Sequence, residues 1–522
     1  MRSRLFSLLL LGLGLALLLG CESGLPTRPP APTTTPWACV PYGTIERPAK
    51  TPTATIRGWP TLPATLTPTP PREAPSSTPT ASPWLPTCTC RPDEPTLTPS
   101  STPAPTITPL ATQPLPYSGG GSSPLALSGQ IGMAFPGGIV LDSQGHAHAV
   151  WYWWDEDYWQ EGKSYYAGQD AAGGWTRRAA LARGAAKSKG AASIAVGPDN
   201  TLYAVYGDGL GRGVRLFLRS SSDSGTTWTA PEPVTSATSA YPTIQVDAAG
   251  VVHILYRRME CAGDPDDEET ICVSYQEHIE GWPGVWSAPE RPVRGGGDQV
   301  HQDMITQVLP DGRNRTWAFI SVQYEGVYAA YKDSGGDWSG AVKVGNTPGK
   351  SAMNIRGIAF DHDGTSFVYV FWNRYAVSGL ETAWSSDGGA SWHYQAVTTL
   401  GGGDTAPFIT SAAPLYDFNT GKLWVLYIHV VWTPRRGFVG VLGVTPGQSD
   451  WFPSVPGPDE KAVLEADSSQ ARSVRVGWRG GLAAGYPVIW EEYISMPEAL
   501  PQIGVYQAWV FPARFPLLWA EP

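Results

Sequence analysis

Seven consecutive residues combine aromatic rings with carboxylates in a way that suits chemistry on a sugar: Trp153, Trp154, Asp155, Glu156, Asp157, Tyr158 and Trp159. Proteins hold sugars by stacking them on aromatic faces and by accepting hydrogen bonds from their hydroxyls on carboxylates. We therefore predict a ligand-binding loop whose contact residues are Trp153, Trp154, Asp155, Asp157 and Trp159. The alternative is aromatic packing over the edge of a sheet, with the acids in solvent.

Other groups of reactive residue types carry weaker signals. The sequence has no Gly-x-Ser-x-Gly elbow, no His-Glu-x-x-His pair and no phosphate-cradling loop. His146 and His148 are two apart in a predicted strand and share a face, where packing or exposure is favoured over metal binding. The acidic run Asp264–Glu269 lacks the spacing of a calcium loop and is predicted to be solvated. We predict no metal and no cofactor.

A repeated turn marks the elements that would position such residues. Ser221–Trp228 and Ser385–Trp392 both read S-x-D-x-G-x-[ST]-W, and Tyr331–Trp338 keeps the Asp, the Gly and the Trp. The Asp can accept hydrogen bonds from a tight turn, the Gly can adopt a positive φ, and the Trp opens the next strand. Tryptophans recur roughly every 55 residues, so the chain is a repeat protein. The predicted structural positions are Ser221, Asp223, Gly225, Trp228, Asp333, Gly335, Trp338, Ser385, Asp387, Gly389 and Trp392.

Each repeat predicts four short antiparallel strands, because an alternating apolar hairpin precedes a third strand, the repeated turn and a Trp-led fourth strand. We predict an all-β propeller with seven four-stranded blades, and six blades as the alternative. The sequence shows seven hairpins but only six Trp-led fourth strands. The segment near Pro124–Met133 is expected to supply the missing strand, which joins the two ends of the domain and removes open sheet edges.

The repeated turn resembles the Asp-box, or BNR repeat, of sialidase-like β-propellers, and as an architecture the resemblance covers residues 124–522. In that family the boxes are structural turns. Its enzymes hold a substrate carboxylate with three arginines, attack with a Tyr that a Glu activates, and use an Asp as acid and base. The first hairpin, Met133–Gly138, contains no arginine where the family's Phe-Arg-Ile-Pro signature has one. The roles that the resemblance implies fall on Arg257, Arg356 and Arg374 as clamp, Tyr324 and Glu325 as nucleophile and base, and Asp303 or Asp155 as acid.

The N-terminal quarter of the chain predicts export and an anchor. Arg2 and Arg4 precede an apolar run, Leu5–Gly20, that is shorter than the ~20 residues of a membrane-spanning helix. The run ends at Cys21 and resembles a bacterial lipobox, so we predict a signal peptide over residues 1–20 and lipidation of Cys21; an ordinary secretory signal is the alternative. Residues 21–123 are rich in Pro and Thr and predict a mostly disordered, extended stalk before the propeller of residues 124–522.

The net charge limits the class of partner, and the cysteines indicate the compartment. The formal net charge of −10, without a basic run, argues against a nucleic-acid surface. Cys261 and Cys272 flank the acidic loop and are predicted to form a disulfide in an oxidising compartment. The pairing of Cys39, Cys88 and Cys90 stays open.

Together these patterns predict a lipoprotein that is attached to the bacterial membrane through Cys21 and presents a sialidase-like propeller at the cell surface. The leading hypothesis for its role is binding of an extracellular ligand, a glycan. The first alternative is a sialidase-like glycoside hydrolase with a diverged site. The second is a scaffold that binds a surface protein.

Overall fold

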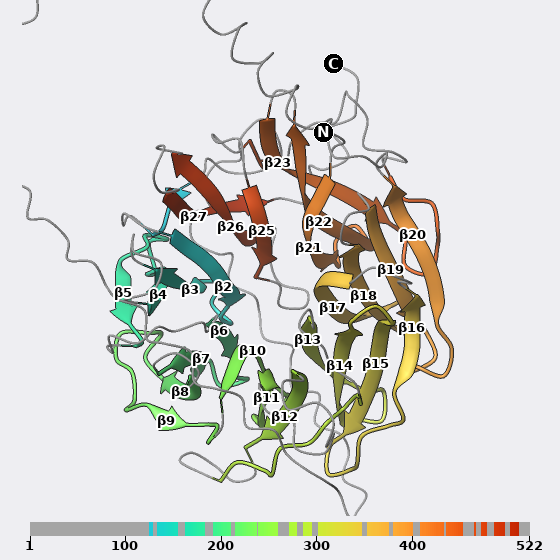
Figure 1. The fold of residues 1–522 in the computed structure, drawn as a ribbon, viewed down its shortest axis with the longest axis horizontal. Helices are drawn as coiled ribbons and strands as arrows, with labels where there is room; N and C mark the ends of the chain where they lie inside the picture. Colours follow the sequence, from blue (N-terminus) through green and yellow to red (C-terminus); the bar gives the residue numbers. More distant parts are fainter. Residues whose placement is uncertain are drawn as a thin grey trace, which may run out of the picture. The chain divides into compact units, whose positions relative to one another are not determined.

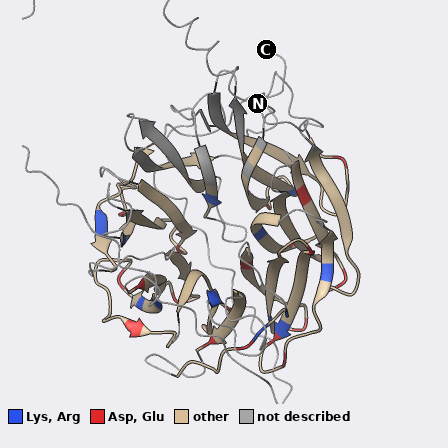
Figure 2. Cartoon of the chain, in the orientation of Figure 1, with Lys and Arg blue, Asp and Glu red and all other residues tan. Residues whose placement is uncertain are grey.

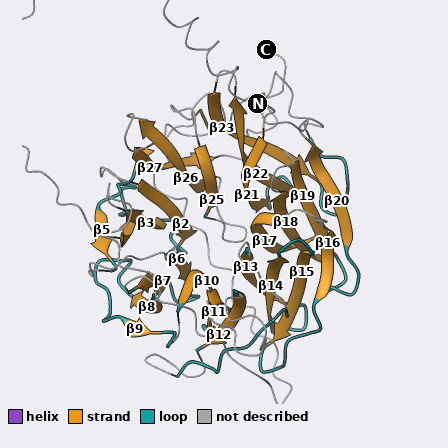
Figure 3. Ribbon diagram, viewed as in Figure 1, coloured by secondary structure: helices purple, strands orange, loops and turns teal. Residues whose placement is uncertain are grey.

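The computed structural model is made of strands and loops, with no helix among the residues it describes (Figure 3). Contacts divide the chain into two units, Met1–Ser100 and Ser101–Pro522, and every described residue belongs to the second. The described residues are 125–128, 133–154, 162–182, 192–209, 214–236, 238–258, 271–278, 285–294, 301–346, 352–374, 379–399, 408–432, 435–452, 464–465, 471–477, 485–495 and 502–510.

Seven antiparallel blades surround a common centre and form a seven-bladed β-propeller, as predicted (Figure 1). The first and seventh blades are joined into one sheet by a parallel pairing of Met133 with Ile503. In each blade the first strand is innermost and the later strands follow outward. The first three blades are β2 (Met133–Leu141), β3 (Ala147–Trp154), β4 (Gly162–Gly168) and β5 (Arg177–Ala180); β6 (Ser193–Val196), β7 (Leu202–Asp208), β8 (Arg215–Ser221) and β9 (Glu232–Pro233); and β10 (Ser239–Val246), β11 (Val252–Arg258) and β12 (Cys272–Glu277).

The next four blades continue around the ring in sequence order. They are β13 (Gln302–Val308), β14 (Asn314–Val322), β15 (Gly326–Asp333) and β16 (Val342–Asn346); β17 (Ala352–His362), β18 (Thr365–Arg374), β19 (Gly379–Ser385) and β20 (His393–Thr399); β21 (Phe408–Asp417), β22 (Lys422–Trp432), β23 (Arg435–Val444) and β24 (Leu464–Glu465); and β25 (Ala471–Val476), β26 (Tyr486–Ser495) and β27 (Gln502–Val510).

Among the described residues, two blades lack a complete fourth strand of their own, and each is completed differently. In the third blade, single bridges from Tyr275 to Glu290 and from His278 to Trp286 stand in place of a fourth strand. In the seventh blade, β1 (Leu125–Ala126) pairs antiparallel with β27, so the beginning of the domain completes the sheet formed by its end. This closure is the one the sequence predicts for the segment near Pro124–Met133.

The core lies between the blades, because each blade buries both faces of its middle strands against its neighbours. β14 shows the consequence in sequence: eight of its nine residues are buried. Large rings fill these layers, among them Trp317, Trp372, Trp424 and Trp490, each less than 2% exposed. A near-continuous apolar run is what a strand covered on both faces requires.

The two closest copies of the repeated turn share one hydrogen-bond pattern. The Ser221 hydroxyl donates to Asp223 Oδ1 (2.7 Å) and accepts from the Gly225 amide (2.8 Å), while the Asp223 carboxylate accepts from the amide and hydroxyl of Thr227. In the second copy Ser385, Asp387, Gly389 and Ser391 repeat these contacts. Ser224 and Gly225 have positive φ, as have Gly388 and Gly389. These donors hold the pKa of Asp223 and of Asp387 at about 2, against the opposing effect of desolvation.

The third copy differs because it lacks the first serine. Asp333 instead accepts from Arg315 Nε (2.6 Å) and Nη2 (3.1 Å), and from Arg313 Nη1 (3.0 Å). These arginine contacts lower the pKa of Asp333. Gly335 keeps its positive φ. The turn shape is therefore retained, while an arginine replaces the serine as the partner of the carboxylate.

The repeating tryptophans join neighbouring blades, although most are only partly buried. Trp228 packs edge-on against Tyr166 of the first blade, with ring centroids 4.9 Å apart, and Trp338 packs in the same way against Tyr275 of the third. Further pairs of this kind are Trp392 with Trp317 and Trp451 with Phe371 by ring contact, and Trp286 with Glu232 and Trp175 with Gln507 by hydrogen bond. All six tryptophans thus contact the preceding blade, so the repeat unit fixes the interface as well as the turn.

Candidate functional site

The centre of the ring is a channel with a volume of about 700 Å³. The innermost strands of all seven blades line it. Because these strands are innermost, residues from every blade meet here. The end of the blades where these strands begin is called here the loop end, and the opposite end, with the repeated turns, the turn end. The size suits a ligand of one or a few sugar rings.

Arg257 stands at the loop end, near the last residue of β11. Its guanidinium lies over the Tyr241 ring, 4.3 Å from the centroid, and its Nε donates to Gln302 Oε1 (3.3 Å). Within the described part of the chain, the partners of Arg257 are uncharged. Burial lowers the pKa of Arg257 to about 10, so the group still carries its charge at neutral pH.

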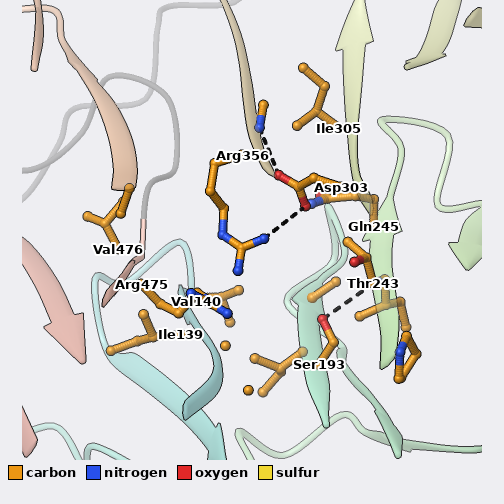
Figure 4. A pocket seen from close by; sticks show the side chains of 18 of the residues that line it. Ile139, Val140, Ser193, Thr243, Gln245, Asp303, Ile305, Arg356, Arg475 and Val476 are labelled. Carbon is orange, nitrogen blue, oxygen red and sulfur yellow. Dashed lines mark hydrogen bonds and ion pairs between the residues drawn. The ribbon is translucent and has the colours of Figure 1, made fainter. Parts of the chain in front are cut away.

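Arg356 enters the channel from β17, where it faces Asp303 of the neighbouring blade (Figure 4). Its Nη1 donates to the Ile355 carbonyl (2.7 Å) and lies 3.9 Å from Asp303 Oδ1, while its Nε is buried without a hydrogen-bond partner. Asp303 Oδ2 accepts from the Gly357 amide (2.8 Å). Burial raises the pKa of Asp303 against the effect of Arg356, and burial lowers the pKa of Arg356. The pair is too far apart for a hydrogen bond between the two side chains.

Asp303 makes a contact to the next innermost strand that serines make in two other blades. Ser193 Oγ accepts from the Ile244 amide (3.4 Å) and Ser411 Oγ from the Val474 amide (3.3 Å), each across to the next innermost strand. Asp303 makes the same kind of contact to Gly357 with one of its two oxygens. A backbone hydrogen bond from Met304 adds to this contact, and Asp303 Oδ1 lies 3.9 Å from Arg356 Nη1.

The charges of the channel are unequal. Arg475, on β25, lies further toward the turn end, yet its charge acts on Asp303. His301 is held neutral, because burial and the charges of Arg257 and Arg356 lower its pKa to about 3. Figure 2 shows Lys and Arg on strands that border the centre of the ring. Arg257, Arg356 and Arg475 therefore line a channel that also has two carboxyls, Asp303 and, at the turn end, Asp247, inside a protein whose formal net charge is −10.

Three of the residues assigned roles by resemblance meet in this channel, namely Arg257, Asp303 and Arg356. Tyr324 and Glu325 lie instead in the turn between β14 and β15 and do not line it. The Tyr324 side chain is 58% exposed, its backbone has a φ of 60°, and Glu325 accepts from the hydroxyl of Tyr328 rather than from Tyr324. Arg374 is the last residue of β18 and pairs with Ala352; its side chain lies outside the described part.

The predicted aromatic loop is described only at its start. Trp153 is partly buried in β3, opposite Ala134, and Lys163 Nζ lies 5.9 Å from its ring. The side chain of Trp154 and the residues Asp155, Asp157 and Trp159 fall outside the described residues. Because β3 ends at the loop end, Trp153, Arg257 and Arg356 lie toward the same end of the ring.

The described residues include only some of the remaining predicted sites. Cys272 is disulfide-bonded, whereas Cys261 and the lipidation site Cys21 lie outside the described residues. In the part that is described, no group of three or more His, Cys, Asp or Glu side chains is arranged to hold a metal ion. Nor does that part contain a helix long and apolar enough to cross a membrane.

His146 lies in the turn before β3, not in the strand, and both it and His148 contact Asp142 at 3.3 Å.

A second, smaller cavity of about 130 Å³ lies at the turn end between the third and fourth blades. Its charges are matched. Lys332 Nζ donates to Glu290 Oε1 (2.8 Å) and to Glu277 Oε1 (3.3 Å), and the Tyr275 hydroxyl contacts both His253 Nδ1 and Glu277 at 2.7 Å. This network joins two blades, and the one ring nitrogen in it without a hydrogen bond among the described residues, His253 Nε2, lies 3.5 Å from the carboxylate of Asp247.

Sequence reasoning missed three lining or supporting residues of the channel: Tyr241, Gln302 and Arg475. Gln302 and Arg475 lie on innermost strands at positions that nothing in a single sequence distinguishes from other strand residues. Tyr241 lies in a β-bulge between Ala240 and Thr243, and bulges leave no clear mark in sequence. The alternation of side chains along each innermost strand would have been the only available signal.

No protein-family profile matches the chain, and no curated protein matches it. Among solved structures, an ulvan lyase, which is a polysaccharide lyase, is 9% identical with a TM-score of 0.47; the match covers 73% of this chain and 95% of that chain. An α-L-arabinofuranosidase from Fusarium graminearum is 11% identical with a TM-score of 0.40, covering 74% and 95%. The Trypanosoma rangeli sialidase is 12% identical with a TM-score of 0.36, covering 63% and 55%. The assignment of a propeller rests on the strand pairing of this chain, and these likenesses do not bear on its activity.

Proposed function

We propose that the propeller binds an extracellular acidic glycan, and that the carboxylate of the glycan occupies the central channel between Arg257 and Arg356. The observation that carries this proposal is the imbalance of charge there: among the described residues, the partly buried guanidinium groups of Arg257 and Arg356 have no carboxylate hydrogen bond, and Arg356 Nε has no partner. A buried cation is costly unless a charge opposes it, and a carboxylate fits the planar fork of a guanidinium.

The uncharged residues that line the channel support a sugar as the part of the ligand that carries the carboxylate. Thr243, Gln245 and Asn354 line the channel beside the arginines and offer hydroxyl and amide groups. Pockets for polar ligands combine such groups at fixed positions with apolar walls, which Ile139, Val140 and Ile305 provide here (Figure 4). A small inorganic anion would leave most of a channel of this volume unfilled.

The test is calorimetric titration of the full-length protein with methyl β-D-glucuronide and, as its neutral match, methyl β-D-glucoside. The glucuronide should bind and the glucoside should bind far more weakly. Arg356→Gln should weaken glucuronide binding about 10- to 100-fold, the range for a lost charged hydrogen bond. Arg313→Gln is the matched control, because Arg313 is 57% exposed and pairs with Asp311 at the turn end. Equal binding of the two glycosides, or an unchanged Arg356→Gln, would contradict the proposal.

A second candidate function is hydrolysis of an acidic glycoside, and one observation favours it. Burial raises the pKa of Asp303, and a carboxyl with a raised pKa beside a cationic site is the form in which an acid can protonate a leaving group. Release of the fluorophore from a fluorogenic sialoside or glucuronide, abolished by Asp303→Asn, would support the enzyme. Absence of turnover with retained binding would leave the binding role alone.

The anchor belongs to the same proposal and rests on sequence. Lipidation at Cys21, followed by the Pro/Thr-rich stalk, would hold the channel away from the membrane, where an extracellular polymer can reach it. In a bacterial host, the protein should partition into detergent and incorporate a fatty-acid label, while Cys21→Ser should lose the label. A labelled Cys21→Ser protein would show that the lipid is attached elsewhere.

A further inference from the structure

Tyr241 occupies a strained position at the loop end of the channel. It lies in the bulge of β10, with a φ of 51°, in the left-handed region that large side chains rarely adopt. It lines the channel, and 41% of its surface is exposed. Strained backbone of this kind persists only where its surroundings hold it, and it clusters at functional sites.

The fifth blade offers a direct comparison. Its innermost strand, β17, has a bulge between Met353 and Arg356, and Asn354 within it has a φ of 50°. Asn is one of the few residues that tolerate this conformation. Each bulge thus has a residue with a φ near the same value, 51° and 50°, and the third blade carries a tyrosine there where the fifth carries a residue type that suits this φ. The shape of the bulge does not explain the ring of Tyr241.

The surroundings of Tyr241 hold its ring in one orientation. The Arg257 guanidinium covers one face of the ring at 4.3 Å, and Gln302 Nε2 donates to the Tyr241 carbonyl. The same Gln302 accepts from Arg257 Nε through its Oε1. One glutamine therefore fixes both the aromatic residue and the arginine beside it, and the uncovered surface of the ring is presented to the channel.

We propose that Tyr241 is the specificity-determining residue of the channel: its ring stacks against the apolar face of a sugar ring whose carboxylate is bound by Arg257 and Arg356. This inference rests on the proposed function and narrows it. The ligand class becomes a uronic acid in its cyclic form, rather than a linear sugar acid or an inorganic anion. C–H groups on one face of a pyranose ring match the electron-rich face of an aromatic ring.

The experiment compares three probes on the full-length protein by calorimetry: methyl β-D-glucuronide, the linear acid gluconate and inorganic sulfate. The parent should bind the glucuronide more tightly than gluconate or sulfate. Tyr241→Asn places in the third blade the residue that the fifth uses at the same φ, so the fold should be kept. It should weaken glucuronide binding about 3- to 10-fold, the range for one aromatic contact, and leave gluconate binding within about twofold. Tyr241→Phe should keep the preference for the glucuronide.

Each other outcome overturns the inference in a distinguishable way. Equal loss of glucuronide and gluconate in Tyr241→Asn would mean that Tyr241 only positions Arg257. An unchanged glucuronide affinity in that variant would show that the ring of Tyr241 does not stack on the sugar. If the parent binds all three probes equally, the channel is an anion site without preference for a ring, and the proposed function stands while this inference fails. If the parent binds none, both fail.

Discussion

The channel and the small cavity at the turn end both collect charged side chains, yet they balance those charges in opposite ways. In the small cavity, Lys332 donates to two glutamates, and Tyr275 and His253 complete the network. In the channel, Arg356 lies 3.9 Å from a single carboxyl whose pKa is raised, and its Nε has no partner. The turn end is a closed structure, and the channel is an incomplete one.

This difference separates stability from binding. A buried charge that its neighbours satisfy joins the blades, whereas a buried charge without a full set of partners is destabilising to the free protein and is useful only when a ligand supplies what is missing. Substitutions at the turn end should therefore lower stability and leave ligand affinity unchanged. Substitutions in the channel should lower ligand affinity and leave stability unchanged.

The largest loss of stability is expected for Trp228→Ala at the turn end. Trp228 packs against Tyr166 of the preceding blade, so the truncation opens a gap between two blades. Since the ring is only partly buried, the expected loss is about 2–4 kcal/mol in the free energy of unfolding. Chemical denaturation would measure it, and methyl β-D-glucuronide affinity below the transition should stay at the parent value. A Trp228→Ala protein that unfolds with the parent would contradict the interpretation of the tryptophans as blade joints.

The same substitution at two buried cations gives the sharpest contrast. Lys332→Met leaves Glu277 and Glu290 facing each other, and because both carboxylates are partly exposed the expected loss is about 1–3 kcal/mol. Arg356→Met removes a poorly satisfied charge, so the unfolding free energy should stay constant or rise by up to about 1 kcal/mol. Glucuronide binding should be lost only in Arg356→Met. Equal destabilisation of the two variants would erase the distinction between the closed and the incomplete site.

A smaller effect at the turn end is expected for Asp223→Ala, which removes the acceptor of the Ser221 and Thr227 hydrogen bonds at a solvent-exposed turn. The loss should be about 1–2 kcal/mol, as for a lost helix cap. The pKa of Asp223 is lowered in the folded state to about 2, so its contribution is complete above the unfolded value near 4 and is lost as the pH falls from about 4 to about 2. The difference in stability between parent and variant should therefore shrink in that pH window; a constant difference would contradict it.

The two regions also differ in how much of their structure the sequence predicts. The turn end repeats: Ser221, Asp223 and Gly225 recur with the same roles at Ser385, Asp387 and Gly389, so the pattern alone predicts the turns, the seven blades and the closing strand β1. Repeated residues can be recognised in the sequence because each repeat packs against its neighbours through the same contacts.

The channel, by contrast, is made of the positions at which the blades differ. Asp303 makes the contact between innermost strands that Ser193 and Ser411 make in other blades, and Tyr241 has the positive φ that Asn354 has in the fifth blade. Residue type suggested Arg257, Asp303 and Arg356, but only the ring brings them together across three blades. Tyr324, with an equally suitable residue type, lies in a turn away from the channel lining.

The smallest expected effect is a dependence of ligand affinity on the ionisation of Asp303. Below its raised pKa the carboxyl is neutral, so only the guanidinium charges act on the carboxylate of methyl β-D-glucuronide. As the pH rises through that pKa, Asp303 becomes an anion and repels the ligand, so affinity should fall by about threefold. His301, with a pKa lowered to about 3, stays neutral in this range and adds nothing. Calorimetry between about pH 4 and 8 should show the fall in the parent and a flat profile in Asp303→Asn. An affinity that rises with pH only in the parent would mean that ionised Asp303 accepts a ligand hydroxyl, and the carboxyl would then belong to the binding contacts.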